Sequence, residues 1–366
     1  MRILLVGGGT GGPVSPLLAV AEEIRKNHPK TEFLLVGSNR GPEREMAKSH
    51  SMPFAKIFAG KYRRYFSLKN LVTPFSTGVG FFQALYLIKK FKPDCVFGAG
   101  SFIQVPVIWA AWLCRIPCLI HQQDFIPSLA NKLCQMAAKK ITVSFEESLK
   151  DFGSGFGLFY KKNKQEKIIF TGNPIRFQEK PASKSAALKF FGLNPEMPVL
   201  FVTGGGTGSV YLNSLVEKAL PKLTKTVQVI HLTGANKNKK IKHENYQQYD
   251  FLNRMDMAFA AADLVLSRAG LSTISELSYF KKVAILIPLP KTHQEINAQY
   301  LELKQAAIAF DQNEMTPDGL VFVVRKLLFK YEMQQQLAKN LFSLMPHDAA
   351  QNIAAEIIKL SQKKSG

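Results

Sequence analysis

Short apolar runs alternate with amphipathic stretches along most of the chain. Helical patterns separate the runs, for example at 81–91 and 128–138. The expected strands are 33–36, 95–97, 118–120, 141–143, 227–232, 264–266 and 284–287. Regular alternation of apolar strands and helices is typical of a parallel sheet that is covered on both faces. The pattern therefore predicts an α/β fold with parallel sheets.

One pattern occurs twice, half a chain apart. Residues 3–12 read ILLVGGGTGG, and residues 199–209 read VLFVTGGGTGS. Each is a short apolar strand and a glycine turn, followed by an amphipathic stretch at 16–24 or 212–223. A strand, a glycine turn and a helix open a Rossmann-like unit. We therefore expect two Rossmann-like domains that face each other across a cleft.

The length of 366 residues also favours two domains. A stretch at 153–167 is rich in Gly, Lys and Asn and lacks apolar periodicity, so it suits a loop before an interdomain hinge. An amphipathic helix is expected at 348–360, near the end of the chain. The predicted organisation is a first domain at 1–170, a second at 171–345, and a helix within 346–366 that packs back toward the first domain.

No membrane-spanning or secretory segment is expected. Met1 and Arg2 run directly into a strand-like sequence, unlike a signal peptide. The most apolar stretch, 96–113, is interrupted by polar residues, glycines and a proline, and we predict a buried strand, a loop and a helix there. Of the four cysteines, Cys95 and Cys118 lie in apolar strands, where cysteine behaves as a small buried apolar residue. We expect a reducing, cytoplasmic compartment.

The charge is the unusual feature of the composition. Hydrophobic residues make up 46% and charged residues 20%, as in an ordinary folded protein. The formal net charge is +21, which favours an anionic partner: nucleic acid, an acidic membrane or a phosphorylated substrate. No nucleic-acid-binding motif accompanies the charge, and the basic residues are spread over both halves, so nucleic acid is not expected.

The first glycine turn also satisfies the G-x-G-x-x-G fingerprint of dinucleotide-binding proteins. That fingerprint requires an acidic residue near the end of the second strand, where it holds the ribose. Here the second strand ends in LVGSN at 35–39, without a carboxylate. A dinucleotide-dependent redox enzyme is therefore disfavoured.

A stronger phosphate-binding pattern lies in the second half. Residues 268–276 read RAGLSTISE, follow the strand at 264–266 and begin a helix. Free N–H groups at such a helix start bind phosphate, and Glu276 one turn inside could accept two hydrogen bonds from a ribose diol. The alternative is a capping box formed by Thr273 and Glu276. A polar cluster at 288–298 follows the next strand and suits a sugar, or else caps its own helix.

Along nearly its whole length the chain resembles the MurG family of membrane-associated N-acetylglucosaminyltransferases. The segments that carry the resemblance are 8–12, 121–123, 131–132, 172–176, 204–208 with Asn213, 268–276, and 293–294 with 297–298. The resemblance implies a GT-B fold and inverting transfer of GlcNAc from UDP-GlcNAc to lipid I, which gives lipid II and UDP in peptidoglycan synthesis. It implies a peripheral enzyme on the cytoplasmic side of the membrane. No cofactor is implied, and no Asp-x-Asp motif or His/Asp cluster indicates a metal.

The same resemblance assigns residues to the donor site. Leu252 and the run from Leu271 to Glu276 would hold uridine and phosphate, Gln294 and Asn297 would hold GlcNAc, and Arg176 and Gly206 would line the nucleotide site. The full predicted set for UDP-GlcNAc is Thr10, Gly11, Gly12, Asp124, Arg176, Gly206, Leu252, Leu271, Ser272, Thr273, Ile274, Ser275, Glu276, Gln294 and Asn297.

The chain departs from the family pattern at several site positions. The family usually has His at Pro13, Glu at Gln122, Asn at Asp124, Gly-Tyr at 101–102 and Ser at Gly206. Inverting transfer needs a base that takes the proton of the acceptor hydroxyl. With proline at 13, the candidates are Asp124, which we prefer, and His121, which alternatively orients its loop.

A basic and apolar segment at 62–92 predicts a membrane-facing patch. Its predicted members are Arg63, Arg64, Lys69, Leu71, Phe75 and Phe82. Basic residues beside large apolar ones suit an anionic lipid surface. The alternative is that Phe81, Leu85 and Ile88 face the core while the lysines are only solvated.

Two classes of function stay open at the level of the sequence. The first is an enzyme: a MurG-like transferase, another GT-B glycolipid transferase or a UDP-sugar epimerase. The second is a basic membrane- or nucleic-acid-binding protein that kept the fold and lost catalysis, an alternative that the loss of the histidine at Pro13 keeps open.

Overall fold

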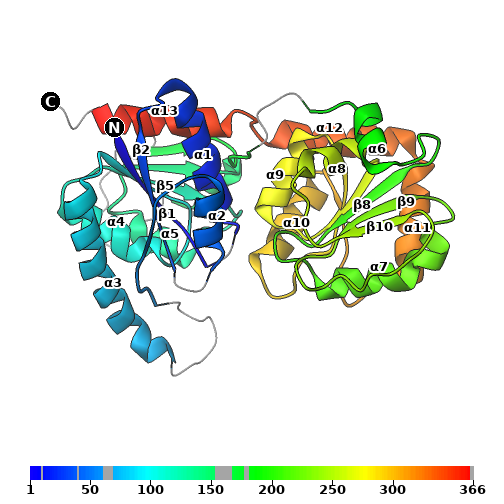
Figure 1. Ribbon diagram of the computed structural model, residues 1–366, viewed down its shortest axis with the longest axis horizontal. Helices are drawn as coiled ribbons and strands as arrows, with labels where there is room; N and C mark the ends of the chain where they lie inside the picture. The colour runs from blue at the N-terminus through cyan, green and yellow to red at the C-terminus, as the bar shows by residue number, and fades with distance from the viewer. Residues whose placement is uncertain (10, 39–40, 61–68, 153–166, 177–180, 363–366) are drawn as a thin grey trace. The chain divides into compact units, whose positions relative to one another are not determined.

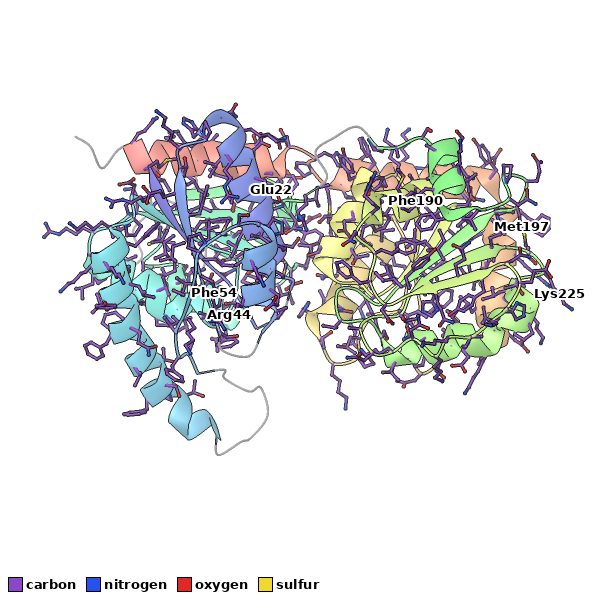
Figure 2. The ribbon with its side chains drawn as sticks, viewed as in Figure 1. Glu22, Arg44, Phe54, Phe190, Met197 and Lys225 are labelled. Atoms are coloured by element: carbon purple, nitrogen blue, oxygen red, sulfur yellow. The ribbon has the colours of Figure 1, made fainter. Side chains whose placement is uncertain are left out.

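The chain forms two compact units in the computed structural model (Figure 1). The first comprises Met1–Arg176 and Pro346–Gly366, and the second comprises Phe177–Met345. The structure describes residues 1–9, 11–38, 41–60, 69–152, 167–176 and 181–362; at 69–72 it describes the backbone only. Side chains fill the space between strands and helices in both units (Figure 2).

The first unit is built on a parallel sheet with the strand order β3-β2-β1-β4-β5-β6-β7. Its strands are β1 (Arg2–Val6), β2 (Glu32–Gly37), β3 (Phe54–Lys56), β4 (Cys95–Gly98), β5 (Cys118–Gln122), β6 (Lys140–Val143) and β7 (Ile168–Phe170). Its helices are α1 (Val14–Asn27), α2 (Glu43–Ser49), α3 (Lys69–Phe91), α4 (Gln104–Leu113), α5 (Leu129–Cys134), the 3-10 helix η1 (Glu146–Leu149) and α13 (Ala349–Gln362).

Apolar residues on both faces of these strands explain why helices cover both sides. Ile3 and Leu5 of β1 belong to a buried cluster that includes α1, and Ile357 of α13 joins it. Leu4 and Val6, which point to the opposite face, belong to a second cluster with α3 and α4. The helix at the end of the chain thus contributes to the core of the first unit.

The second unit repeats this design with the strand order β10-β9-β8-β11-β12-β13, again parallel. Its strands are β8 (Val199–Thr203), β9 (Gln228–Leu232), β10 (Tyr246–Tyr249), β11 (Leu264–Ser267), β12 (Val283–Leu286) and β13 (Ile308–Ala309). Its helices are α6 (Lys184–Phe191), α7 (Val210–Leu223), α8 (Met255–Ala261), α9 (Leu271–Tyr279), α10 (His293–Leu303), α11 (Pro317–Leu328) and α12 (Tyr331–Leu344).

Both faces of the second sheet are covered as well. Leu200 and Val202 of β8 belong to a buried cluster that includes residues of α7 and α11. On the other face, the ring of Phe201 meets Phe259 of α8 edge-on at 5.2 Å, and Phe259 stacks on Phe280 at 5.1 Å. The predicted α/β fold with parallel sheets is therefore confirmed for each unit.

The elements expected from the sequence are largely in place. The apolar stretch 96–113 is a buried strand, a loop and a helix, as predicted. The helix predicted at 128–138 was too long, because α5 ends at Cys134. The N–H of Lys139 donates to the carbonyl of Cys118 at 2.7 Å, which already aligns the chain for β6. The loop predicted at 153–167 lies almost wholly outside the described residues.

Two further sequence predictions concern the cysteines and membrane-spanning segments. Cys95, Cys118 and Cys134 are buried free thiols, so the predicted burial of the first two is confirmed. Burial raises the pKa of the Cys95 thiol to about 12. In the part of the chain that the structure describes, no helix has the length and hydrophobicity needed to span a bilayer.

Candidate functional site

The predicted site residues gather where strands end. All pairings in the two sheets are parallel, so the carboxyl ends of neighbouring strands lie at the same edge. Loops at that edge carry ligand-binding groups in open α/β sheets. Each unit therefore has its own set of candidate site residues.

In the first glycine turn, a buried carboxylate occupies the space beside the backbone. Glu43 of α2 is fully buried, and its Oε1 accepts hydrogen bonds from the N–H of Gly9 and from the Ser38 hydroxyl, the latter at 2.9 Å. A Cβ at Gly8 would collide with this Oε1 and come within 2.7 Å of Ile103. A dinucleotide site needs that space for the approach of the pyrophosphate. The geometry therefore agrees with the sequence in disfavouring a dinucleotide.

The remaining residues of this turn prepare the start of α1. The carbonyl of Gly11 accepts the N–H groups of Val14 at 3.2 Å and Ser15 at 3.0 Å. Pro13 precedes the helix with a φ of −66°, which the proline ring favours. Gly11 and Gly12 are half-buried, and Thr10 lies outside the described residues. Proline at 13 thus suits the entrance of α1.

His121, at the carboxyl end of β5, is completely buried. Its Nδ1 lies 2.9 Å from the Thr142 hydroxyl, and its Nε2 lies 3.3 Å from Asn173 Oδ1 and 3.2 Å from the Ser144 hydroxyl. Burial lowers the pKa of His121 to about 4, so the ring is neutral near pH 7. With both nitrogens engaged and no exposed surface, the ring fits the orienting role better than that of a base.

Gln122 fixes the loop that carries Asp124. Its Nε2 donates to the backbone carbonyls of Asp124 at 2.7 Å and Ile126 at 2.9 Å. Its Oε1 accepts from Asn131 Nδ2 at 2.6 Å and from the N–H of Ser128 at 3.2 Å. All four hydrogen-bonding positions of the amide are therefore used.

This amide network continues into the interior, where Gln104 donates to Asn131 Oδ1 and also accepts the N–H of Gly100 at 2.9 Å. Asp124 itself is half-buried at the start of the loop. The network thus places a partly accessible carboxylate on a loop whose backbone is held at several points. Arg176, also predicted for the donor site, is exposed, with its Nε 3.8 Å from the carboxylate of Glu22 in α1.

The second glycine turn, after β8, needs glycine at particular positions. Gly205 and Gly208 have φ of 79° and 68°, in the left-handed region that favours glycine. Ser209 caps α7 by accepting the N–H of Leu212 at 3.3 Å. Gly206, by contrast, is exposed, its φ is not positive, and nothing lies within 4 Å of a Cβ built on it. The turn thus leaves open space at Gly206.

The predicted phosphate-binding run leads from β11 into α9, and its last six residues, 271–276, lie in the helix. Its N-cap is Gly270, which offers no side-chain cap to the first N–H groups. Thr273 lies inside the helix, so the alternative of a capping box with Glu276 is wrong. Leu271, Ile274 and Ser275 are buried, which leaves only their backbone to a ligand. The half-buried members of the run are Ser272, Thr273 and Glu276.

The polar cluster after β12 lies beside this helix start. Gln294 accepts the N–H of Leu289 at 3.0 Å, and its Nε2 would be 3.8 Å from a Cβ at Gly270. Asn297 is fully buried and donates to the carbonyl of Ala269 at 3.2 Å. The structure therefore brings α10 and the start of α9 together. Leu252, also buried, follows the end of β10 in the same sheet.

Two basic residues, Lys237 and Arg268, lie in this region, and no sequence pattern assigned a role to either of them. Lys237 donates to the carbonyls of Thr207 at 2.7 Å and Gly208 at 3.2 Å, so its ammonium lies at the second glycine turn. It stands in a lysine-rich loop 30 residues away, and no sequence signal singled it out. Arg268 is the first residue of the predicted run, and its guanidinium Nη2 donates to the Ser209 hydroxyl at 3.0 Å. An arginine directly after a buried strand was a usable signal.

The predicted membrane patch is visible in part. Phe75 and Phe82 of α3 are 76% and 71% exposed, and Val79 and Tyr86 are exposed at the same helical spacing. Ile88 is buried, with Phe81 and Leu85 packed against the same core. One face of α3 is thus apolar and solvent-exposed while another is packed.

The other predicted members of this patch are not described to the same extent. Lys69 and Leu71 lie in α3, but their side chains are outside the description, and Arg63 and Arg64 lie outside the described residues altogether.

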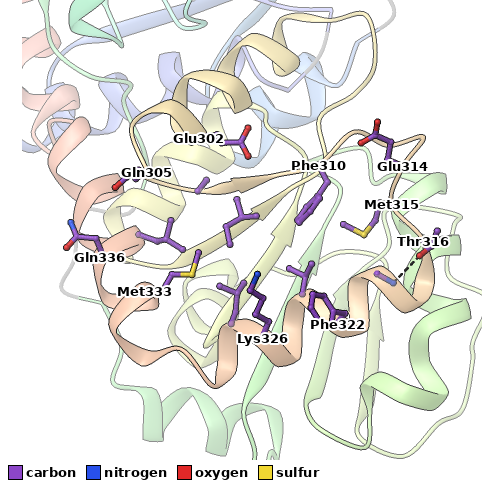
Figure 3. A pocket seen from close by; sticks show the side chains of 16 residues that line it. Glu302, Gln305, Phe310, Glu314, Met315, Thr316, Phe322, Lys326, Met333 and Gln336 are labelled. Atoms are coloured by element: carbon purple, nitrogen blue, oxygen red, sulfur yellow. Dashed lines mark hydrogen bonds between the residues drawn. The ribbon is translucent and has the colours of Figure 1, made fainter.

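A cavity of about 680 Å³ lies elsewhere in the second unit, between β13, α11 and α12 (Figure 3). Its lining is mostly apolar, with Phe310, Met315, Phe322 and Met333 around it and Lys326 extending beside them. None of the residues predicted for the donor or acceptor lines it. The cavity therefore does not contain the predicted site residues, although the loop after β13 contributes Phe310 and Met315 to its lining.

Comparison with known proteins identifies the family. The glycosyltransferase family 28 N-terminal domain matches residues 3–143, and the family 28 C-terminal domain matches residues 199–359. The Acinetobacter baumannii MurG crystal structure matches with a TM-score of 0.73 and 23% identity, over 98% of this chain and 99% of that one. This match confirms the predicted GT-B fold class.

Two curated relatives carry the name UDP-N-acetylglucosamine–N-acetylmuramyl-(pentapeptide) pyrophosphoryl-undecaprenol N-acetylglucosamine transferase. The Bacillus cereus protein, numbered 2 in its name, is 34% identical over 346 residues, which cover 93% of this chain and 95% of the relative. The Lachnospira eligens protein is 37% identical over 333 residues, which cover 89% and 90%. The chain therefore belongs to the MurG family of glycosyltransferases, as its sequence motifs predicted.

Proposed function

We propose that this protein transfers GlcNAc from UDP-GlcNAc to the muramyl sugar of undecaprenyl-pyrophosphoryl-MurNAc-pentapeptide, with inversion at the anomeric carbon. The names of relatives that it matches over nine-tenths of their length support this activity. The observation that carries the proposal within the chain is the helix start of α9, whose N-cap residue Gly270 has no side chain, with Glu276 inside the helix. Such a helix start binds phosphate through free N–H groups and its dipole.

The second unit would hold the donor. The diphosphate would lie at the N-terminus of α9 and at the second glycine turn, where Gly206 leaves open space. The Glu276 carboxylate would accept hydrogen bonds from the ribose hydroxyls, and Leu252 would contact the uracil. Gln294 would bind the sugar, while Asn297 would act by holding the carbonyl of Ala269 and thereby the approach to α9.

The first unit would hold the acceptor. Asp124 would remove the proton from the acceptor hydroxyl as that oxygen attacks the anomeric carbon and UDP departs. His121 would position this loop, since its ring is neutral and bonded at both nitrogens. Gly11, Gly12 and Arg176 would complete the nucleotide contacts from the first unit, together with Thr10.

The membrane surface would be met by α3. The exposed Phe75 and Phe82 would enter the interface of the bilayer, and the basic residues Arg63, Arg64 and Lys69 would attract anionic lipids. A lipid-linked acceptor requires such a location. We place the enzyme on the cytoplasmic side as a peripheral membrane protein, because the nucleotide sugar is a cytoplasmic metabolite in the reaction that the family resemblance implies.

Ligand-induced stabilisation tests the donor assignment. UDP-GlcNAc and UDP should stabilise the second unit and so raise its melting temperature. At a ligand concentration of 100 times the Kd, the gain in unfolding free energy is about 2.7 kcal/mol. UDP-glucose should do so much less and NAD not at all. Stabilisation by NAD but not by UDP would overturn the proposal. In Glu276→Ala, donor affinity should fall by about 1–3 kcal/mol, whereas Glu302→Ala, which removes an exposed carboxylate near the end of α10, should be close to wild type.

Product analysis separates the transferase from the other enzyme classes. Incubation with UDP-GlcNAc and a short-chain lipid I analogue should give a disaccharide lipid and UDP in equal amounts. Conversion of UDP-GlcNAc into a second UDP-sugar without acceptor would indicate an epimerase. Tight UDP binding without transfer or conversion would indicate a homologue that has lost catalysis.

A further inference from the structure

Arg268 is a buried arginine that has no anionic partner among the residues that the structure describes. It follows β11 directly and precedes Gly270, the N-cap of α9. Its residue surface is only 7% exposed. Arginine is rarely buried to this extent unless a carboxylate pairs with it. Within the described part of the chain, no carboxylate lies within ion-pair distance of this guanidinium, which makes the position unusual.

All five N–H groups of the guanidinium are used on neutral acceptors. Nη1 donates to the carbonyls of Ile287 at 3.0 Å and Pro288 at 2.8 Å. Nε and Nη2 donate to the Ser209 hydroxyl at 3.2 and 3.0 Å, and Nη2 also donates to Gln312 Oε1 at 2.7 Å. A guanidinium has five donors, so none remains for a ligand. Arg268 therefore does not act by touching one.

These bonds connect four loops at the carboxyl edge of the second sheet. Ser209 belongs to the glycine turn after β8 and caps α7, Arg268 itself leads into α9, Ile287 and Pro288 follow β12, and Gln312 follows β13. Tyr211 extends the connection: its ring lies 5.6 Å from the Arg268 guanidinium, and its hydroxyl donates to the carbonyl of Gln312 at 2.5 Å. One side chain thus fixes the spacing of the starts of α7 and α9.

We propose that Arg268 is a positioning residue for the diphosphate of the donor and that this anion balances the positive charge of Arg268 when it binds. The inference rests on the proposed donor site at the second glycine turn and α9. A buried cation between two helix starts adds a fixed positive charge where both helix dipoles already favour an anion. Low local polarity makes that charge act over a longer distance than it would in water.

A comparison of charged and uncharged ligands tests this role. UDP carries phosphate charge and uridine carries none, so removal of the Arg268 charge should weaken UDP much more than uridine. In Arg268→Met, the Kd for UDP should rise by about 10- to 100-fold, and the Kd for uridine by less than about threefold. The ratio of the two constants is measured on one preparation by calorimetry and by competition, so it does not depend on the folded fraction.

Matched variants complete the experiment. Arg268→Lys keeps the charge and loses the planar set of donors, so its UDP-to-uridine ratio should stay near wild type while kcat falls because the loops loosen. Arg268→Gln provides a second neutral side chain if the methionine variant does not fold. Arg325→Met, on α11 and exposed, controls for loss of an arginine in the same unit. Equal weakening of UDP and uridine in the neutral variants would overturn the proposal, whereas failure of the wild type to bind UDP would overturn the donor site itself.

Discussion

The side-chain amide of Gln122 donates to the backbone carbonyl of Asp124 at 2.7 Å, although the two residues are only two positions apart. The same amide nitrogen holds the carbonyl of Ile126 at 2.9 Å. The loop that carries the proposed base is therefore fixed by two donors that a carboxylate could not supply. The relationship gives a structural reason for glutamine here, where the family resemblance would place glutamate.

Gln122→Glu should destabilise the first unit even though it introduces the usual family residue. The two carbonyls would lose their donors and face a carboxylate, at a cost of about 2 kcal/mol or more. Both tryptophans of the chain, Trp109 and Trp112, lie in this unit, so urea unfolding followed by their fluorescence reports on it. Gln83→Glu is the control, because among the described residues Gln83 accepts a bond from the N–H of Phe58 at 2.8 Å and donates none. Equal stability of the two variants would contradict this account.

The two glycine turns and the apolar strands could be predicted from the sequence because their signals are local. A run such as 199–203 is buried at every position, and glycine is needed at Gly205 and Gly208 for their backbone angles. Contacts made over long separations could not be predicted. Lys237 reaches the turn at Thr207 from 30 residues away, and Glu43 reaches Gly9 from 34. The alternative of a capping box at Thr273 and Glu276 was wrong because the same local sequence also allows a helix that begins earlier. In the structure the N-cap is Gly270.

Gly206→Ser should fold as well as wild type and bind the donor more tightly. Nothing lies within 4 Å of a Cβ at this position, and its φ is not in the left-handed region. A hydroxyl there would add a donor toward the diphosphate, which we expect to lower the Kd for UDP about threefold to tenfold. Gly208→Ser is the contrasting variant, because a Cβ at Gly208 would collide with the carbonyl of Thr233. It should lower the melting temperature of the second unit.

The stability of the first unit should fall as the pH drops from about 6.5 toward 4. The pKa of His121 is about 4 in the folded protein, below its ordinary value of 6.5, so the unfolded chain binds a proton more readily in this range. The neutral His121 ring therefore contributes fully to the unfolding free energy above about pH 6.5, and about 2 kcal/mol of that contribution is lost by pH 5. Urea unfolding followed by tryptophan fluorescence at pH 7.5 and 5.0 measures the difference.

His121→Asn should show a smaller loss between these two pH values, because no buried imidazole is left to protonate. His28→Asn is the matched control, since His28 is on the surface of the same unit. If wild type and His121→Asn lost the same stability on acidification, the buried neutral state of this ring would not be the cause.

Membrane binding should depend on the exposed face of α3. Changing Phe75 and Phe82 together to Ser should reduce binding to anionic vesicles at least tenfold, since each large apolar side chain contributes about 1.5–3 kcal/mol when buried. Phe322 and Phe329, which are also largely exposed but lie in the second unit, are the control pair whose replacement should change little.

The charged part of the membrane patch is tested separately. Changing Arg63, Arg64 and Lys69 to Gln, or adding salt, should weaken binding to anionic vesicles but not to neutral ones. Salt-independent binding to both kinds of vesicle would remove the electrostatic part of the proposal and leave the apolar part standing.

Asp124→Asn should restore the usual family residue and still lower turnover. If Asp124 removes the proton of the acceptor hydroxyl, kcat should fall by about two to four orders of magnitude, the range that general bases contribute. The Kd for UDP-GlcNAc should change little, because the proton comes from the acceptor. The substitution should leave the hydrogen bond from Gln122 in place, since that bond goes to the backbone carbonyl of Asp124.

Asp151→Asn, an exposed change in the same unit, is the control for the loss of a surface carboxylate. The competing role for Asp124 is contact with the acceptor sugar or the donor, which would appear as a higher KM with kcat nearly intact. Single-turnover rates with saturating acceptor distinguish the two, because they report the chemical step alone. A near-normal rate in Asp124→Asn would exclude the base assignment, and the donor predictions for Glu276 and Gly206 would still stand on their own measurements.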